Sequence, residues 1–213
     1  KVRFIGADSL HLATSLPPVA PWFSTCDTIV PAREPLDPGA RVVVAHSPSN
    51  REKKGTDAIL AKLELEQRDI AAFRAEYSAW DGLPPEMAID LIEGVPYAEA
   101  RDRRERAHIF VDQLNPSIGG FGASAVEAMA QGCAVIADIR NVVYEDVWAR
   151  YGLDAPPIVE VRDADALEEE LDRLVRCEGD LYWTRQASLD WAREYAAPLP
   201  FARYFLRMLE QYA

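Results

Sequence analysis

The sequence predicts an α/β domain in which helices cover both faces of a parallel sheet, and three observations lead to this prediction. Short apolar runs rich in β-branched residues alternate with longer segments of good helix formers. The strand candidates are almost continuously apolar, which is typical of parallel strands buried on both faces. Of the 213 residues, 49% are hydrophobic, which is enough for a sizeable core.

The expected strands and helices follow one another from residue 41 onward. Residues 1–40 are expected to be irregular, apart from a short strand at 2–5, because six prolines interrupt this segment. We then expect, in order, strand 41–45, helix 56–77, strand 87–92, helix 96–106, strand 108–114, helix 123–131, strand 133–138, helix 142–151, strand 158–161 and helix 163–177. The chain therefore divides into an N-terminal segment (1–40), a sheet domain (41–196) and a C-terminal helix (197–213).

Composition excludes some classes of partner. A net charge of −12 argues against DNA or RNA, and no apolar run approaches the length of a membrane span. The three cysteines are far apart and odd in number, so we expect a cytoplasmic protein without a disulfide framework or a metal signature. Residue 1 is Lys rather than Met, and we expect a processed chain or an excerpt of a longer one.

A polar, basic loop follows the first strand of the domain. It contains a hydroxyl, an amide and three cations, namely Ser49, Asn50, Arg51, Lys53 and Lys54. Ligands of parallel sheets bind beyond the carboxyl ends of the strands, and Arg and Lys bind phosphate by a bidentate fork or a point charge. The alternative is a polar loop in which Thr56 or Asp57 caps the next helix.

A second candidate lies in a glycine-rich stretch before the helix expected at 123–131. It comprises Gly119, Gly120, Phe121, Gly122, Ala123 and Ser124. Glycines allow close approach of the backbone, and the free N–H groups of a helix start attract anions, so a phosphorylated ligand is predicted. The alternative is a tight turn. For Glu127 the alternative role is a capping box with Ser124.

The order of these motifs resembles the C-terminal domain of family 4 retaining glycosyltransferases. The shared order is Ser-Asn-Arg, Lys-Gly-Thr, helix, Ile-Glu-Gly, Asp-Gln-Leu, Gly-x-Gly and Glu-Ala-Met-Ala-x-Gly, over about residues 42–138. A narrower branch shares the His-x-Pro-Ser-Asn-Arg loop. The resemblance implies a Rossmann-like fold that is one half of a GT-B enzyme and binds a nucleotide diphosphate-sugar donor. It also implies an acceptor-binding half in the same parent chain or a partner chain, with residues 1–40 as the interdomain connection.

The resemblance assigns a role to each candidate. Arg51 and Lys54 would hold the diphosphate and stabilise the departing nucleotide, so that neither a metal nor another cofactor is expected. Lys53 would be solvated, Glu127 would accept hydrogen bonds from the ribose, and Ser49 and Asn50 would contact the ligand. The amides of Gly122, Ala123 and Ser124 would receive phosphate.

Two strand ends complete the predicted site. By the resemblance, Glu93 and Gly94 would lie near the nucleotide, and Asp112 and Gln113 would read the base; each could equally be a turn residue or a buried polar group. The family usually has a second glutamate at the position of Gly119, which puts the choice of sugar in doubt, although the narrower branch tends to have glycine there.

Two other functions stay open. Gly120-x-Gly122-x-x-Ala125 fits a loose dinucleotide fingerprint, with Asp138 ending the next strand, which would indicate an NAD(P)-dependent oxidoreductase. A non-catalytic nucleotide-binding module is the other. His46 is expected to be structural. We expect Trp183 and Trp191 to pack in the core or between helices, and the aromatic residues of the tail to pack on the core or on the missing half.

Overall fold

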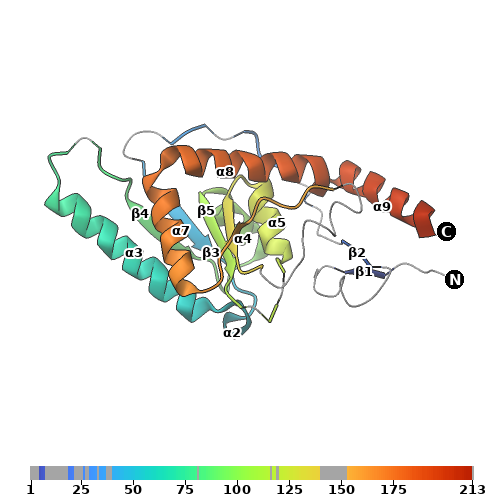
Figure 1. Cartoon of the computed structure of the whole chain (residues 1–213), viewed down its shortest axis with the longest axis horizontal. Coiled ribbons are helices and arrows are strands. Elements are labelled where there is room, and N and C mark those ends of the chain that lie inside the picture. The colour runs from blue at the N-terminus through green and yellow to red at the C-terminus, as the bar shows by residue number, and fades with distance from the viewer. Residues whose placement is uncertain are drawn as a thin grey trace.

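The computed structural model describes residues 5–7, 19–21, 26, 29–32, 34–36, 40–80, 82–115, 117–118, 120–139 and 153–212. Its centre is a five-stranded parallel sheet in the order β4-β3-β5-β6-β7 (Figure 1). The strands are β3 (Val42–His46), β4 (Met87–Leu91), β5 (Ile109–Gln113), β6 (Ala134–Ala137) and β7 (Val159–Glu160). Each lies within or one residue beyond its predicted range, so the parallel α/β sheet is confirmed.

Helices cover both faces of this sheet (Figure 1). On one face lie α3 (Thr56–Glu76) and α7 (Ala164–Arg176), and on the other lie α4 (Tyr97–Glu105) and α5 (Ala123–Ala130). The side chains of β3 divide accordingly, since Val42 and Val44 join the core under α3 and α7 whereas Val43 and Ala45 join the core under α4 and α5. This alternation explains why the strands are apolar throughout.

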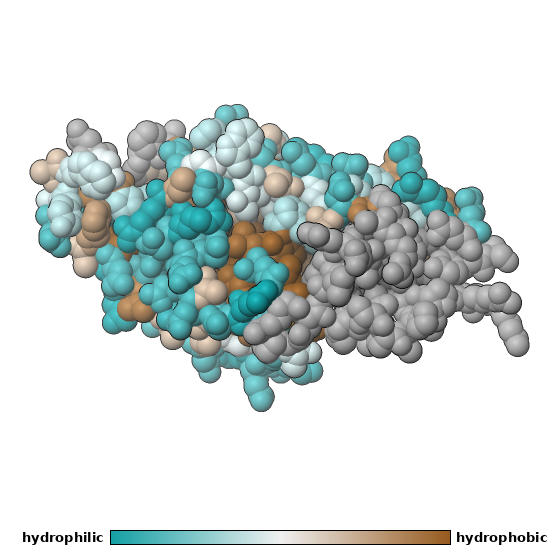
Figure 2. All heavy atoms as spheres, in the orientation of Figure 1, coloured by the Kyte–Doolittle hydropathy of each residue, from teal (hydrophilic) through white to brown (hydrophobic). Residues whose placement is uncertain are grey.

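The helices α3 and α7 form because their apolar residues repeat at helical spacing. Leu167, Leu171 and Leu174 are buried on α7, and the carboxylate of Asp163 caps its start by accepting from the amides of Asp165 and Ala166 at 3.1 and 2.9 Å. The opposite side of this helix is charged. Figure 2 shows that the outward surface of α3 and α7 is mainly hydrophilic.

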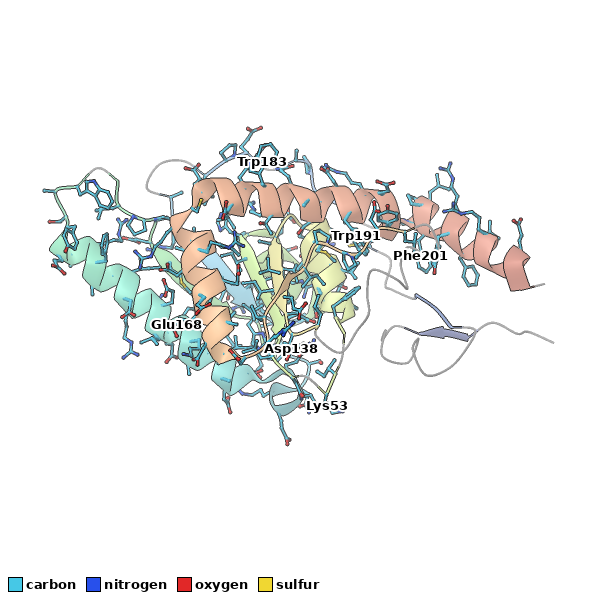
Figure 3. All side chains as sticks on the ribbon, viewed as in Figure 1. Lys53, Asp138, Glu168, Trp183, Trp191 and Phe201 are labelled. Carbon is cyan, nitrogen blue, oxygen red and sulfur yellow. The ribbon has the colours of Figure 1, made fainter. Side chains whose placement is uncertain are left out.

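The C-terminal helices extend from the sheet domain. Helix α8 (Glu178–Trp191) contacts both α5 and α7, and a short π-helix, η1 (Ala192–Ala196), joins it to α9 (Pro198–Tyr212). Trp191 is buried in the core beside α5 as predicted, but Trp183 points outward and is 69% exposed, so its predicted packing in the core or between helices is wrong (Figure 3). Tyr204 is buried and Phe201 and Phe205 pack on the same core, which fits the core-packing alternative for the tail.

Three short elements differ from the prediction. Strands β1 (Ile5–Ala7) and β2 (Val19–Pro21) pair in parallel within the segment that was expected to be mainly irregular. A single helical turn, α2 (Arg51–Lys54), lies in the expected loop after β3. The helix predicted at 142–151 lies outside the described residues.

The sheet topology indicates where a ligand binds. From β3 the chain passes to the edge strand β4 and then returns to β5 on the other side of β3. Connections therefore leave β3 and β5 in opposite directions, which opens a crevice beyond their carboxyl ends. The segment with Lys54 follows β3, and the glycine-rich loop follows β5.

Candidate functional site

A cavity of about 420 Å³ lies at this crevice and gathers residues from three segments of the chain. The β3–α2 loop and α2 contribute Ser47, Pro48, Ser49 and Lys54, and the β4–α4 segment contributes Ile92, Glu93, Gly94, Val95, Tyr97 and Ala100. The start of α5 contributes Gly122, Ala123, Ser124 and Glu127. Eight residues of the predicted site thus share one cavity, namely Ser49, Lys54, Glu93, Gly94, Gly122, Ala123, Ser124 and Glu127.

The turn α2 places Lys54 in this cavity. Its N-cap is Asn50, whose side chain accepts from the Lys53 amide at 2.8 Å, so the described contact of the Asn50 side chain is structural. The turn ends at Gly55, which has a φ of 71° and lies so close to Leu114 that a Cβ atom would meet its side chain at 3.4 Å. Lys53 is exposed, as predicted (Figure 3).

The capping alternative for the next helix is wrong. Helix α3 starts from Gly55 without a side-chain cap, and Thr56 is buried with its hydroxyl 2.9 Å from Nε2 of His46. Nδ1 of His46 lies 2.7 Å from the carbonyl oxygen of Val111 and must donate to it. Burial lowers the pKa of His46, so the neutral ring accepts from Thr56 and is structural, as expected.

A buried ion pair anchors the amino group of Lys54. Nζ of Lys54 lies 2.6 Å from Oδ1 of Asp112, whose side chain is fully buried at the end of β5. The same carboxylate accepts from the amide of Gly122 at 3.1 Å and from the hydroxyl of Ser124 at 2.9 Å. Asp112 therefore fixes Lys54 against the start of α5. A Cβ atom on Gly122 would lie 3.4 Å from Nζ of Lys54, which shows how closely the amino group approaches this loop.

Gln113, the last residue of β5, anchors the glycine-rich loop to the sheet. Its Nε2 donates to the carbonyl oxygen of Gly120 at 3.0 Å and also to that of Asp138. Asp112 and Gln113 are fully buried and neither lines the cavity, so their contacts match the alternative of a buried polar group. Contact of either residue with a base stays a prediction. Gly120 and Phe121 are also buried beneath the site, and Gly119 lies outside the described residues.

Glu127 does not form the capping box. The N-cap of α5 is Gly122, and the Glu127 carboxylate points toward α4 instead. Its Oε2 pairs with the guanidinium of Arg104, and its Oε1 accepts from the hydroxyl of Tyr97 at 3.1 Å. Arg104 is buried and also contacts Gln131 at 3.4 Å. The partners Tyr97 and Arg104 were not predicted; only their separation of seven residues, which places them on one face of α4, points to them.

Arg51 lies outside the cavity. Its guanidinium donates to Glu93 at 2.9 Å and to Asp57 at 2.8 Å, and its side chain is 43% exposed. Hydrogen bonds to Asp57 and Glu93 raise the pKa of Arg51. The sequence therefore places two cations in one turn, but the structure gives them different surroundings. Lys54 lies inside the cavity, and Arg51 reaches its rim only through Glu93.

Across the part of the chain that the structure describes, no group of three or more His, Cys, Asp or Glu side chains is arranged to hold a metal ion. Among these same residues, none of the helices combines the length and apolarity needed to span a bilayer.

No family model and no curated protein matches the chain by sequence, but solved structures match its fold. A crystal structure of S. aureus TarM is 13% identical and covers 97% of this chain with a TM-score of 0.58. Sucrose-phosphate synthase from Thermosynechococcus elongatus is 17% identical and covers 98% with a TM-score of 0.57. The chain spans 43% of the TarM chain and 57% of the synthase chain. It therefore has the fold of one half of a GT-B glycosyltransferase, which confirms the predicted fold.

Proposed function

We propose that this domain is the donor-binding half of a retaining glycosyltransferase and that its cavity holds the nucleoside diphosphate part of a nucleotide-sugar. The observation that carries the proposal is the position of Lys54, whose amino group lies against the first turn of α5 in the cavity that also contains Glu127. A cation and helix-start amides suit phosphate, and a carboxylate suits the hydroxyls of a ribose. The ligand would thus lie with its diphosphate at Lys54 and its ribose at Glu127.

The phosphate end combines several donors. The amides of Ala123 and Ser124 belong to the first turn of α5, where N–H groups have no acceptor within the helix. The Gly122 amide, in contrast, already donates to Asp112, so its predicted contact with phosphate is replaced by a role in anchoring the loop. We assign Arg51 to the rim of the cavity. There its guanidinium would leave Glu93 and bind diphosphate oxygens instead.

These groups account for the proposed chemistry. When the bond between the anomeric carbon and the diphosphate oxygen breaks, the electron pair stays with the diphosphate, and Lys54 and the helix-start amides stabilise the added negative charge. An acceptor hydroxyl then forms the new bond to the anomeric carbon and gives its proton to the departing diphosphate oxygen. Because the chain spans about half of the proteins it matches, the acceptor would be bound by a second half in the same parent chain or in a partner chain.

The comparison with TarM supports a nucleoside diphosphate as ligand, because that structure is described as a complex with UDP. Isothermal titration calorimetry with UDP, GDP, ADP, NAD and NADP tests the proposal. We expect one diphosphate to bind. Binding of a nicotinamide dinucleotide alone would instead indicate the oxidoreductase, and no binding would indicate a module without this function.

A pair of adjacent lysines provides the matched control. Lys54→Gln should weaken diphosphate binding at least about tenfold, because a charged hydrogen bond to phosphate is lost. Lys53→Gln, which changes the same charge at an exposed neighbour, should bind like the wild type. Circular dichroism identifies the fraction of the Lys54 variant that is folded. Equal affinities of the folded variants would contradict the assignment of Lys54.

A further inference from the structure

Each oxygen of the Glu127 carboxylate has a partner within the protein, and the two partners differ. Arg104, at Oε2, is only 3% exposed and lies between α4 and α5. Tyr97, at Oε1, is 64% exposed and stands at the first position of α4 and on the wall of the cavity. One partner is thus buried between two helices, and the other is a mainly exposed side chain on the cavity wall.

The direction of the second hydrogen bond is clear from its chemistry. Partial burial of the hydroxyl and the negative charge of Glu127 raise the pKa of Tyr97, so the phenol is protonated. It therefore donates to Oε1 at 3.1 Å. A ribose hydroxyl would donate to the same carboxylate oxygen. The tyrosine hydroxyl and the ligand hydroxyl are chemically alike, and both would approach Oε1 from the cavity, because Tyr97 stands on its wall. Although a carboxylate oxygen can accept two hydrogen bonds, the two hydroxyls would need the same space beside Oε1.

We infer that Tyr97 competes with the ribose of a nucleoside diphosphate for Glu127: its hydroxyl donates to Oε1 from the wall of the cavity and must yield this position to a ribose hydroxyl. The inference rests on the proposed function. Arg104 keeps the carboxylate in place during the exchange because it holds the other oxygen from a buried position. Tyr97 is in this sense a positioning residue rather than a catalytic one.

Such competition lowers the apparent affinity of any ligand that needs Oε1, by the fraction of molecules in which Oε1 is free. A ligand without ribose hydroxyls leaves the Tyr97–Glu127 bond intact and is unaffected. Removal of the phenolic hydroxyl should therefore strengthen binding of the ribonucleotide alone. This sign is unusual, since loss of a hydroxyl that contacted the ligand directly would weaken binding.

The test is calorimetry of Tyr97→Phe with the diphosphate that binds best among UDP, GDP and ADP, and with its 2′,3′-dideoxy analogue. We expect ribonucleotide affinity to rise about three- to tenfold, as for one hydrogen bond to a charged group at a partly exposed site. Affinity for the dideoxy analogue should stay the same. In the Glu127→Gln background, the gain for the ribonucleotide should disappear.

Tyr77→Phe is the matched control, because Tyr77 is also exposed and lies at the end of α3, away from the cavity residues. It should change neither affinity. If the wild type binds a diphosphate and Tyr97→Phe weakens or does not alter it, the inference is wrong while the proposed function stands. An equal gain for the dideoxy analogue also overturns the inference. If the wild type binds none of the three diphosphates, the proposed function and the inference both fail.

Discussion

Two of the buried carboxylates lie under opposite conditions, Asp112 at the end of β5 and Glu66 in the middle of α3. Asp112 is 0% exposed and accepts three hydrogen bonds, from Lys54, Gly122 and Ser124. Glu66 is 4% exposed, and its Oε1 has no hydrogen-bond partner among the described residues. The guanidinium of Arg176 is 4.0 Å from this oxygen. The fold therefore supplies three hydrogen-bond donors to Asp112, whereas Oε1 of Glu66 accepts no hydrogen bond from the described residues.

The surroundings of Glu66 explain its state. It lies on the buried stripe of α3 between Leu63 and Ile70, where burial is set by the helix spacing. The groups that surround it are mainly acidic, namely Asp69 on α3 and Asp165, Glu168, Glu169 and Asp172 on α7, with Lys62 and Arg176 as the cations. Burial, and then the charge of Asp172, raise the pKa of Glu66 to about 7. Asp112, beside the cavity, is instead part of a complete network.

The largest expected effect comes from breaking the Asp112 network. Asp112→Asn keeps the shape of the side chain but removes the negative charge beside Lys54. Its NH2 group would take the place of an oxygen that now accepts a hydrogen bond, so two donors would face each other. Loss of one partner of a buried ion pair should destabilise the domain by about 3 kcal/mol. Urea unfolding followed by circular dichroism measures the change in the free energy of unfolding.

A surface ion pair provides the control for Asp112. Arg41 and Glu86 are both more than half exposed, and Glu86→Gln should change the free energy of unfolding by less than about 1 kcal/mol. If Asp112→Asn changed the free energy of unfolding as little as this control, the contrast between a hydrogen-bonded buried carboxylate and a surface carboxylate would not hold.

The next effect has the opposite sign and concerns Glu66. The folded domain holds this proton with a pKa of about 7, whereas the ordinary value is 4.5, so stability is lost as the pH rises from 4.5 through 7. Glu66→Gln removes the charge that causes this loss. It should therefore raise the free energy of unfolding at pH 8 by about 1–3 kcal/mol and leave it nearly unchanged at pH 4.5.

Unfolding curves at pH 4.5, 6 and 8 measure this effect. Glu64→Gln is the control, because Glu64 is an exposed residue on the same helix, and it should leave the pH profile of the wild type intact. A Glu66→Gln variant that is less stable at pH 8 than the wild type would mean that the carboxylate has a partner that stabilises its charged form.

The strands could be predicted from local sequence, because parallel strands buried on two faces need continuous apolar runs. The position of Lys54 beside the glycine-rich loop was expected from the family resemblance, and the turn α2 that places it there, ending at the left-handed Gly55, was not predicted. The role of Asp112 could not be decided, since a ligand contact and a buried ion pair both need a polar residue at a strand end. Trp183 was misplaced because a helix that packs at the edge of a domain leaves one face exposed.

The partners of Glu127 and Glu66 could not be predicted because they depend on how helices pack against each other. Tyr97 and Arg104 reach Glu127 only because α4 lies beside α5, and no motif marks α4. Glu66 lies visibly on an apolar stripe in the sequence. Its repulsion by Asp172, however, arises only where α7 covers α3.

The smallest effect on stability is expected at Arg51, whose partners are surface carboxylates. Asp57 is 87% and Glu93 is 38% exposed, so water can replace the guanidinium at both, and Arg51→Gln should change the melting temperature by no more than about 2 °C. Diphosphate affinity should nevertheless fall about tenfold, because one charged donor is lost and Glu93 is left unpaired at the cavity. Arg41→Gln, another exposed and paired arginine, should alter neither quantity. A fall in melting temperature with unchanged affinity would make Arg51 structural, and the proposed phosphate end would then depend on Lys54 and the helix-start amides.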